Sequence, residues 1–263
     1  MSRFAILNML FIAGAVLTGY LVFSGFTSWY SLLFLALAYL LILIAGVSRV
    51  DFELFMDIEN SGDNRYNKIA LSFDDGPNPE ITPEVLDKLA RYGVKAAFFC
   101  IGGKVEEHQA LAGRIHREGH ILGNHSFYHK NDFPFQKVEA IKEELQNCNR
   151  AIARACGFEP LFFRPPFGVT NPRIAKAVKE LEMTTIGWSL RTFDTAKSPE
   201  KVIKKLRKKL TGGDLILLHD NHPGVLEILD FLIPYAEQQG LEFVRPDGLL
   251  AKEGERALVQ KEK

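Results

Sequence analysis

The chain has 263 residues, with 32 basic and 32 acidic side chains, 47% hydrophobic residues and three cysteines. This composition excludes a disordered, collagen-like or disulfide-stapled protein, because it offers ample apolar surface for a core and few cysteines. The balanced charge also argues against a nucleic-acid partner, since binding to phosphates needs clustered Lys and Arg side chains.

Residues 1–48 are almost entirely apolar, and Arg3 is their only charged side chain. Residues 4–23 and 29–47 each supply about 20 uncharged residues, the length of a helix that spans ~30 Å of hydrocarbon. We therefore expect two transmembrane helices. A cleaved signal peptide is one alternative, although its apolar core would be only ~7–15 residues long. A buried helical hairpin is the other.

The turn between the two spans covers residues 24–28, which is too short for anything but a tight hairpin. The N-terminus and the rest of the chain therefore lie on the same side of the membrane. Arg3 and Arg49 flank the two ends of the hairpin. By the positive-inside tendency they favour the cytoplasmic side.

The remainder of the chain is predicted to form a linker over residues 49–67 and one soluble domain over residues 68–263. Short apolar runs alternate there with amphipathic stretches, which is typical of βα units around a parallel sheet. Six helices are expected to alternate with seven strands. The strands are predicted over residues 69–73, 96–101, 120–123, 161–164, 184–189, 215–219 and 242–244.

Three helix starts are marked by a capping side chain directly before a proline: Thr82-Pro83, Asn171-Pro172 and Ser198-Pro199. Residues 201–210 have apolar side chains at helical spacing with lysines between them. We expect these lysines to form a solvated helix face. Contact with an anionic lipid surface is the alternative.

Two adjacent carboxylates, Asp74 and Asp75, lie at the end of the first predicted strand and precede a turn-forming Gly-Pro-Asn-Pro sequence. That edge of a parallel sheet is where α/β proteins bind ligands. Because successive side chains of a strand point in opposite directions, the two carboxylates are expected to have different roles. A solvated turn would be the better interpretation if the motif stood alone.

His125 and His129 follow the third predicted strand at a spacing that lets both imidazoles reach one metal ion. Asp75 would supply a third ligand. This set suits Zn²⁺, with Co²⁺ or another divalent transition ion as alternatives, and such an ion lowers the pKa of a bound water towards ~7. His116 and His120 have the same spacing, but a glycine interrupts their helix and we expect them to be structural.

Three further polar side chains fall at the same edge of the predicted sheet. Arg164 follows the fourth predicted strand, Asp194 follows the fifth, and His219 ends the sixth. Any one of them alone would be read as surface charge or a satisfied core group. Their convergence with the metal ligands predicts one active-site cleft that holds a base, an acid and orienting groups.

Four motifs in order resemble those of the polysaccharide deacetylase family, the carbohydrate esterases of family four, over about residues 68–247. The resemblance implies an α/β fold, a distorted (β/α)7 barrel, preceded here by an N-terminal transmembrane helical hairpin. The motifs are Phe73-Asp74-Asp75-Gly76-Pro77, His125-Ser126-Phe127-Tyr128-His129, Arg164-Pro165-Pro166-Phe167 and Leu217-Leu218-His219.

The resemblance also implies roles for individual residues. Asp74 would be the general base and His219 the general acid, and the metal would be held by Asp75, His125 and His129. These roles agree with the interpretation reached from the residues themselves.

Two further roles are implied by the third motif. Arg164 would hold and orient Asp74, and the backbone N–H of Phe167, where the family usually has Tyr, would help bind the oxyanion. Loss of the phenol does not remove a main-chain donor.

The remaining motif of the family, D-x-x-D-W, reads here as Arg191-Thr192-Phe193-Asp194-Thr195. Its first Asp and its Trp are therefore missing. Asp194 is retained and would pair with the motif-three arginine and tune the acid histidine. The missing Trp would form one wall of the acyl pocket, and Trp188 or Leu217 would supply apolar surface there instead.

The resulting hypothesis is a metal-dependent hydrolase that removes N-acyl groups, above all N-acetyl groups, from amino sugars of a polysaccharide or glycan. One alternative is a deacylase or deformylase of a lipid-linked sugar, which the two membrane spans favour. Another is a membrane-tethered glycan-binding protein whose catalysis has faded, which the altered motif favours.

The cysteines bear on the compartment. Cys100, Cys148 and Cys156 are odd in number and their spacing implies no disulfide, which suits a reducing space, whereas the resemblance points to the cell envelope. We expect an integral protein of a bacterial inner membrane, and the side that carries the soluble domain stays open. Cys100 is expected to be buried in the second strand.

Overall fold

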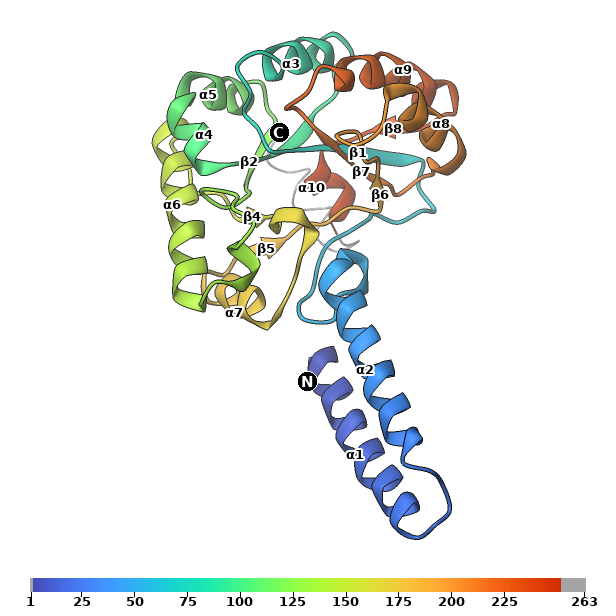
Figure 1. The fold of residues 1–263 in the computed structure, drawn as a ribbon. Coiled ribbons are helices and arrows are strands. Elements are labelled where there is room, and N and C mark those ends of the chain that lie inside the picture. Colours follow the sequence, from blue (N-terminus) through green and yellow to red (C-terminus); the bar gives the residue numbers. More distant parts are fainter. Residues whose placement is uncertain (1, 252–263) are drawn as a thin grey trace.

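A curled sheet of parallel strands forms the centre of the protein, and a two-helix hairpin projects from the α/β body (Figure 1). The computed structural model describes residues 2–251. The strands are β1 (Lys68–Asp74), β2 (Ala96–Cys100), β3 (Ile121–Asn124), β4 (Phe162–Phe163), β5 (Thr184–Thr185), β6 (Leu190–Arg191), β7 (Leu215–His219) and β8 (Glu242–Phe243). The order along the sheet is β5-β4-β3-β2-β1-β7-β6, and β8 pairs with the start of β1. This arrangement confirms the α/β fold of the barrel type.

The strand predicted over residues 184–189 is wrong beyond its first two residues, because β5 ends at Thr185 and a separate strand, β6, begins at Leu190 at the opposite end of the sheet. The carbonyls of Ile186 and Gly187 accept hydrogen bonds from the Arg164 guanidinium. A continuous strand would have needed the same carbonyls for a neighbouring strand. The buried arginine therefore interrupts the strand.

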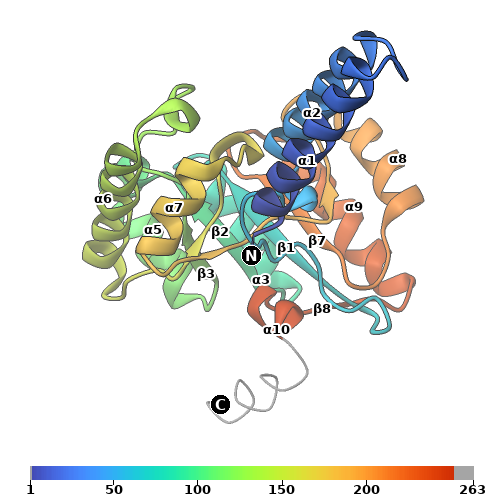
Figure 2. The same ribbon diagram turned by 90° about the horizontal axis from the view of Figure 1, so that it is seen from below.

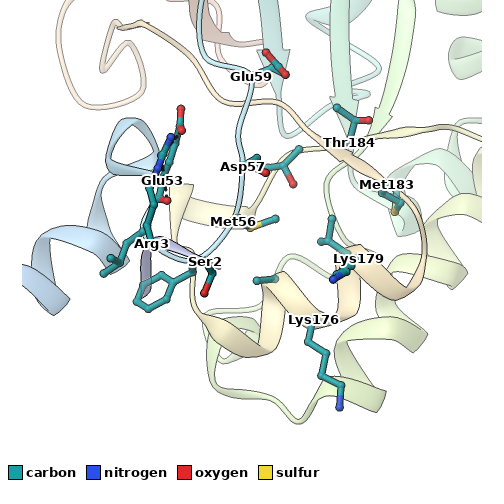
Figure 3. Close-up of a pocket in the computed structure, with 15 residues that line it drawn as sticks. Ser2, Arg3, Glu53, Met56, Asp57, Glu59, Lys176, Lys179, Met183 and Thr184 are labelled. Carbon is teal, nitrogen blue, oxygen red and sulfur yellow. Dashed lines mark hydrogen bonds and ion pairs between the residues drawn. The ribbon is translucent and has the colours of Figure 1, made fainter. Parts of the chain in front are cut away.

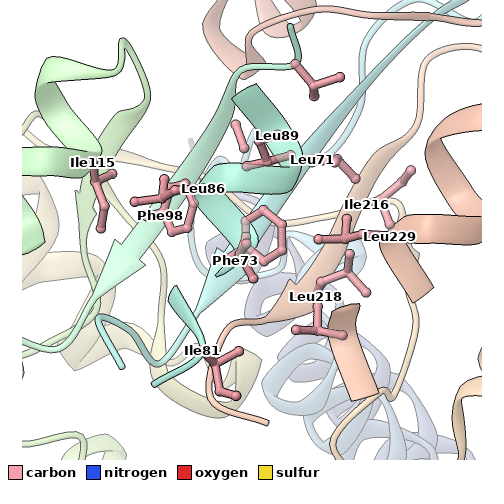
Figure 4. Packing of buried hydrophobic residues seen from close by; sticks show 14 of the residues in the cluster. Leu71, Phe73, Ile81, Leu86, Leu89, Phe98, Ile115, Ile216, Leu218 and Leu229 are labelled. Carbon is pink, nitrogen blue, oxygen red and sulfur yellow. The ribbon is translucent and has the colours of Figure 1, made fainter. Parts of the chain in front are cut away.

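Helices surround the sheet, and the core between them contains the two stacked rings of Phe73 and Phe98, whose centroids lie 4.9 Å apart (Figure 4). Aliphatic side chains of neighbouring helices cover these rings, among them Leu86 and Leu229. The helices are α3 (Thr82–Arg91), α4 (Gly102–Glu107), α5 (Gln109–Arg117), α6 (Val138–Cys156), α7 (Pro172–Glu180), α8 (Pro199–Lys209), α9 (Gly224–Gln238) and α10 (Pro246–Leu250). Short 3₁₀ turns are η1 (Val50–Phe52), η2 (Phe133–Phe135) and η3 (Pro166–Gly168).

The predicted helix starts are confirmed to within one residue. Asn171 caps α7, since its side chain accepts hydrogen bonds from the N–H groups of Arg173 and Ile174. Ser198 precedes α8 without a side-chain cap, and Thr82 is already the first residue of α3. More helices than the expected six follow β1, because residues 102–117 form two helices and α10 lies after β8.

The N-terminal hairpin consists of α1 (Arg3–Phe23) and α2 (Tyr30–Ser48), which lie side by side in both views (Figures 1 and 2). The Tyr39 hydroxyl donates a 2.6 Å hydrogen bond to Asn8 between them. Both helices are long and apolar enough to cross a membrane, with 0% and 6% of their apolar windows buried. This exposure rules out the buried helical hairpin, and a membrane hairpin and a signal sequence remain.

The segment between the hairpin and β1 fills the gap in the curled sheet between the end of β5 and the residues just before β7. Glu59 exchanges backbone hydrogen bonds of 2.9 Å with Thr185 and Gly187, and the N–H of Gly62 donates to the carbonyl of Gly213. Three of its apolar side chains are buried as well: Val50, Leu54 and Ile58. The segment that was expected to act as a linker is therefore packed and hydrogen-bonded along much of its length.

Candidate metal centre and active site

Asp75, His125 and His129 converge at the carboxyl ends of β1 and β3. The Oδ1 atom of Asp75 lies 3.6 Å from Nε2 of His125 and 3.4 Å from Nε2 of His129, and one ligand atom from each residue lies within 4.8 Å of the other two. Bonds of ~2.0–2.2 Å around a tetrahedral ion separate its ligand atoms by roughly 3.4 Å. The donor set therefore fits a divalent transition ion.

The hydrogen bonding of His125 and the lowered pKa of His129 also suit a metal site. Nδ1 of His125 lies 2.8 Å from the carbonyl oxygen of Arg164, to which it can only donate, so Nε2 presents a lone pair towards Asp75. Burial and the neighbouring His125 lower the pKa of His129 to about 4. The His129 ring is thus available as a neutral ligand at neutral pH, and Nε2 of His125 is the nitrogen that faces the metal position.

The backbone around the ligands is held in unusual conformations. Asp75, Ser126 and His129 have φ angles of 71°, 62° and 51°, in the left-handed region that residues other than glycine rarely occupy. Such strain persists only where the surroundings impose it, and it gathers at functional sites. Here Ser126 Oγ accepts from the N–H of His129 at 3.0 Å.

Several residues that support the ligands were missed by the sequence analysis. The Glu144 carboxylate accepts from the N–H groups of Phe127 and Tyr128, the two residues between Ser126 and His129. Lys104 Nζ donates to the carbonyl of Asp75 at 2.8 Å, and Asn221 Nδ2 donates to Oδ2 of Asp75 at 3.1 Å. None of these residues lies in a recognised motif, and only the folded loops bring them together.

Asp74 lies beside the metal ligands and is held by Arg164, as the third motif implies. The fully buried guanidinium donates to Oδ1 of Asp74 at 2.8 Å and to the hydroxyl of Ser72 at 2.9 Å, and it lies 4.0 Å from the ring centroid of Phe99. The other carboxylate oxygen of Asp74 faces Nε2 of His125 at 3.8 Å. One oxygen is thus anchored while the second is directed towards the metal position.

His219 occupies the opposite side of the site at the end of β7, in register with Asp74. Its Nδ1 lies 2.9 Å from Oδ1 of Asp194, and its backbone N–H donates to Oδ2. Burial lowers the pKa of His219, but the hydrogen bond and negative charge of Asp194, with the charges of Asp74 and Asp75, outweigh burial and raise it above its usual value. His219 is therefore suited to donate a proton at neutral pH.

Asp194 is shared by two histidines, and the sequence analysis found only one of them. Nε2 of His222 lies 3.0 Å from Oδ2 of Asp194. Burial raises the pKa of the Asp194 carboxyl, but hydrogen bonds from His219 and His222 more than reverse this effect and hold the pKa far below its usual range. In this structure Asp194 contacts the acid histidine, whereas the arginine of the third motif is bound to Asp74.

A further buried carboxylate, Asp220, lies against Gly76 in the turn that follows Asp74 and Asp75. Burial raises its pKa to about 7, and its Oδ2 accepts a 2.5 Å hydrogen bond from Thr82 Oγ1. A Cβ atom at Gly76 would lie 2.4 Å from the same carboxylate, so only glycine fits there. The Thr82 hydroxyl thus bonds α3 to the residue that follows β7, and it does not cap the helix.

The three residues expected to contact substrate differ in exposure. The ring of Phe167 is 41% exposed and lies 4.6 Å from the ring of His129, so this residue borders the metal position. Trp188 is 9% exposed and Leu217 only 2%. Both pack against Val50, so they form a wall behind the site more than a surface open to solvent.

A cavity of about 870 Å³ lies away from this site, and none of the candidate catalytic or metal-ligand residues lines it (Figure 3). It is bounded by the start of α1, the segment around Met56, and Lys176 and Lys179 of α7. We therefore place the chemistry at the converging carboxylates and histidines, where the functional groups are, and treat this cavity as a gap at the hairpin junction.

Comparison with known proteins agrees with this placement. The polysaccharide deacetylase family model matches residues 61–186, which include Asp74, both metal-ligand histidines and Arg164. The chain is 35% identical over 196 residues to the peptidoglycan-N-acetylglucosamine deacetylase PgdA of Listeria monocytogenes; this covers 74% of the chain and 41% of that relative. The chain thus spans less than half the length of that protein.

Two solved structures share the fold. One is the Bc1960 peptidoglycan N-acetylglucosamine deacetylase in complex with an N-hydroxybenzamide, with a TM-score of 0.69, 30% identity, and coverage of 73% of this chain and 91% of that one. The other is a family-four pseudoenzyme from Bacillus anthracis, with a TM-score of 0.68, 27% identity, and coverage of 73% and 68%. Together with the four motifs and the geometry of the site, these matches show that the chain belongs to the polysaccharide deacetylase family.

Proposed function

We propose that the protein is a metal-dependent hydrolase that removes N-acyl groups, above all N-acetyl groups, from amino sugars of a glycan. The observation that carries this proposal is the position of three metal-ligand candidates between a carboxylate anchored by arginine and a histidine anchored by aspartate. Two of the proteins named above are peptidoglycan N-acetylglucosamine deacetylases, which supports an N-acetylated amino sugar as the substrate.

A divalent ion, Zn²⁺ or Co²⁺, held by Asp75, His125 and His129 would supply Lewis acidity that polarises the amide carbonyl and acidifies a water. Asp74 takes the proton of the attacking water as its oxygen forms the new bond to the acyl carbon. The N–H of Phe167 donates to the developing oxyanion.

His219 completes the reaction by giving a proton to the sugar nitrogen as the C–N bond breaks, so that a neutral amine leaves with acetate as the second product. Protonation is needed because an amide anion is a far worse leaving group than an amine. Asp194 keeps the His219 ring oriented and charged for this step. Trp188, behind Arg164, is proposed as a wall of the acyl pocket.

We further propose that residues 1–48 anchor the protein in a bacterial inner membrane as a two-span hairpin. Residues 49–67 then connect this anchor to the catalytic domain, which begins at residue 68; its proposed C-terminal end at residue 263 lies outside the described residues. The support is the length, apolar composition and exposure of α1 and α2.

The test is acetate release from N-acetylated chitooligosaccharides by the metal-loaded full chain. Asp74→Asn and His219→Ala should each remove most of the turnover while the metal content stays near one ion per chain. Near-normal turnover in either variant would contradict the assigned roles. A wild-type protein that binds metal and the glycan but releases no acetate would favour the faded glycan-binding protein, a possibility that the similarity to a family-four pseudoenzyme supports.

A further inference from the structure

The membrane hairpin is bonded directly to the loop that carries the active site. Thr170, three residues after Phe167, donates from its backbone N–H to the carbonyl of Val47 and from its hydroxyl to the carbonyl of Gly46, both at 3.1 Å. Three residues of chain span at most about 10 Å. The last turn of α2 is therefore only roughly 10 Å from Phe167, the residue whose ring lies against His129.

The hairpin leaves the barrel on the side of its catalytic edge. In Figure 2 it extends to the opposite end of the body from α10, which packs against the start of β1. The side chain of Val50, just beyond α2, packs in one cluster with Trp188 and Leu217. If α2 ends at the bilayer surface, the mouth of the active site is held next to that surface.

Three cations surround one exposed ring on the loop after β6. The centroid of Phe193 lies 4.8 Å from the guanidinium carbon of Arg191, 4.9 Å from Nζ of Lys197 and 4.7 Å from Nζ of Lys205. We call these four residues the Phe193 cation cluster. Arg191 also stacks on Trp188 at 5.3 Å, which links the cluster to the wall behind Arg164.

The positive charges of this cluster have no carboxylate partner within residues 2–251 that forms an ion pair with them. Lys205 Nζ instead donates to the carbonyl of Arg191 at 2.6 Å, and burial and the like charges of Lys197 and Arg191 lower its pKa. An adjoining cavity of about 340 Å³ is lined by Arg191, Lys205, Lys209 and Asp51. Asp51 is already paired with Arg49, so the cavity offers a net positive charge to an anion.

The cluster is close to the reacting groups. Arg191 is in register with Leu217, which precedes His219 by two residues on the neighbouring strand. At ~3.3 Å per residue and ~4.8 Å between strands, the backbones of Arg191 and His219 are roughly 8 Å apart. An anionic group bound at the cluster and a sugar at the metal position would thus belong to one small molecule.

We propose that the Phe193 cation cluster binds the phosphate groups of a membrane-borne substrate, an amino sugar joined through a phosphate or diphosphate to a lipid, while its N-acyl group lies at the metal centre. This inference rests on the proposed deacylation. Lys and Arg groups around a partly desolvated pocket bind phosphate strongly. The lipid source, as opposed to a soluble sugar phosphate, follows from the attachment of α2 to the active-site loop.

The test compares three substrates with the metal-loaded full chain in detergent micelles: farnesyl-diphosphate N-acetylglucosamine, the soluble nucleotide sugar UDP-N-acetylglucosamine, and N,N′-diacetylchitobiose. We expect kcat/KM for the lipid-linked sugar to exceed that for each of the other two by about tenfold or more. Lys197→Gln with Lys205→Gln should raise KM for the lipid-linked sugar about tenfold, which would reduce this selectivity.

The matched control is Lys204→Gln with Lys208→Gln, which removes two charges from exposed positions of the same helix, α8, and should leave the selectivity within about twofold. Equal kcat/KM values for the lipid-linked and nucleotide sugars would contradict a lipid-linked substrate. Equal effects of the two double variants on KM would contradict phosphate binding by the Phe193 cation cluster. A KM difference that vanishes when phosphatidylglycerol is added in excess would assign the cluster to bulk lipid headgroups and also overturn the proposal. Acetate release from chitobiose in any of these cases would leave the proposed function standing, whereas no release from all three substrates would reject that function itself.

Discussion

The two sides of the active site differ in how closely they follow the family motifs. On the side built by β1, β3 and β4, Asp75 and the two histidines converge and Arg164 anchors Asp74, each at the position that a motif predicts. On the side built by β6 and its following loop, Asp194 is kept but Arg191 and Thr195 replace an acidic and an aromatic residue. The first side therefore departs from the motifs only at Phe167, whereas the second side has lost an acidic and an aromatic residue, and we expect the second side to differ most in how it recognises substrate.

The largest loss of turnover is expected from removal of a candidate metal ligand. His125→Ala removes a ligand that no other described side chain replaces, so turnover should fall more than about a thousandfold because the Lewis acid is lost. Metal content measured by mass spectrometry should fall with it. His120→Asn, which removes a buried histidine outside the site, is the control and should keep both the metal and the activity.

Removal of Arg164 should affect both folding and activity. Arg164→Met leaves the Asp74 carboxylate buried without its cation, which typically costs about 3–5 kcal/mol of unfolding free energy. Chemical denaturation measures this loss. Arg114→Met breaks the ion pairs with Asp87 and Glu118 nearer the surface and should cost no more than about 1 kcal/mol of unfolding free energy. Equal losses of unfolding free energy in the two variants would show that the buried Arg164–Asp74 pair contributes no more to stability than a surface pair.

Changes at Asp194, the partner of His219, should alter the pH dependence of kcat. Asp194 raises the pKa of His219, so the protonated acid persists to higher pH than it would alone. Asp194→Asn removes that charge, lowers the pKa of His219, and should move the alkaline limb of kcat to lower pH, with turnover reduced by about 10- to 100-fold. Asp214→Asn, at a buried carboxylate near the start of β7, is the control. An alkaline limb of kcat that stays at the same pH would show that Asp194 does not control the pKa of the general acid.

The smallest effect is expected at the altered loop. Phe193→Leu keeps an apolar side chain but removes the ring that the three cations surround, so each loses a contact of about 0.5–1 kcal/mol. KM for a lipid-linked sugar should rise only two- to fivefold, with kcat unchanged. A larger fall in kcat than rise in KM would mean that Phe193 positions Asp194 instead of the cations.

Much of the metal side could be predicted from the sequence, because its residues lie within short motifs at the ends of strands. The metal ligands and Asp74 come from two such motifs, and the parallel sheet brings strand ends to one edge. Lys104, Asn221 and His222 could not be predicted in the same way, since their contacts depend on how separate loops pack. Spacing alone does not define the shape of a loop.

The second side was harder to predict for the same physical reason. Lys205 was expected on a solvated helix face, but packing of α8 turns its ammonium group towards the loop after β6. β5 ends early because the side chain of Arg164, the residue after β4, takes the carbonyls of residues 186 and 187. Long-range competition of this kind leaves no local pattern in the sequence.

If residues 1–48 anchor the protein in a membrane as proposed, the packing of residues 49–67 between β5 and β7 has a consequence for release of the protein. Proteolysis just after α2 would cut the acceptors of Thr170 away from the body, and a cut near residue 67 would also remove Glu59 and three apolar side chains worth about 1.5–3 kcal/mol each. Shedding is therefore expected to destabilise the barrel instead of producing a stable secreted form. Anchor and barrel are expected to be synthesised, inserted and turned over as one unit.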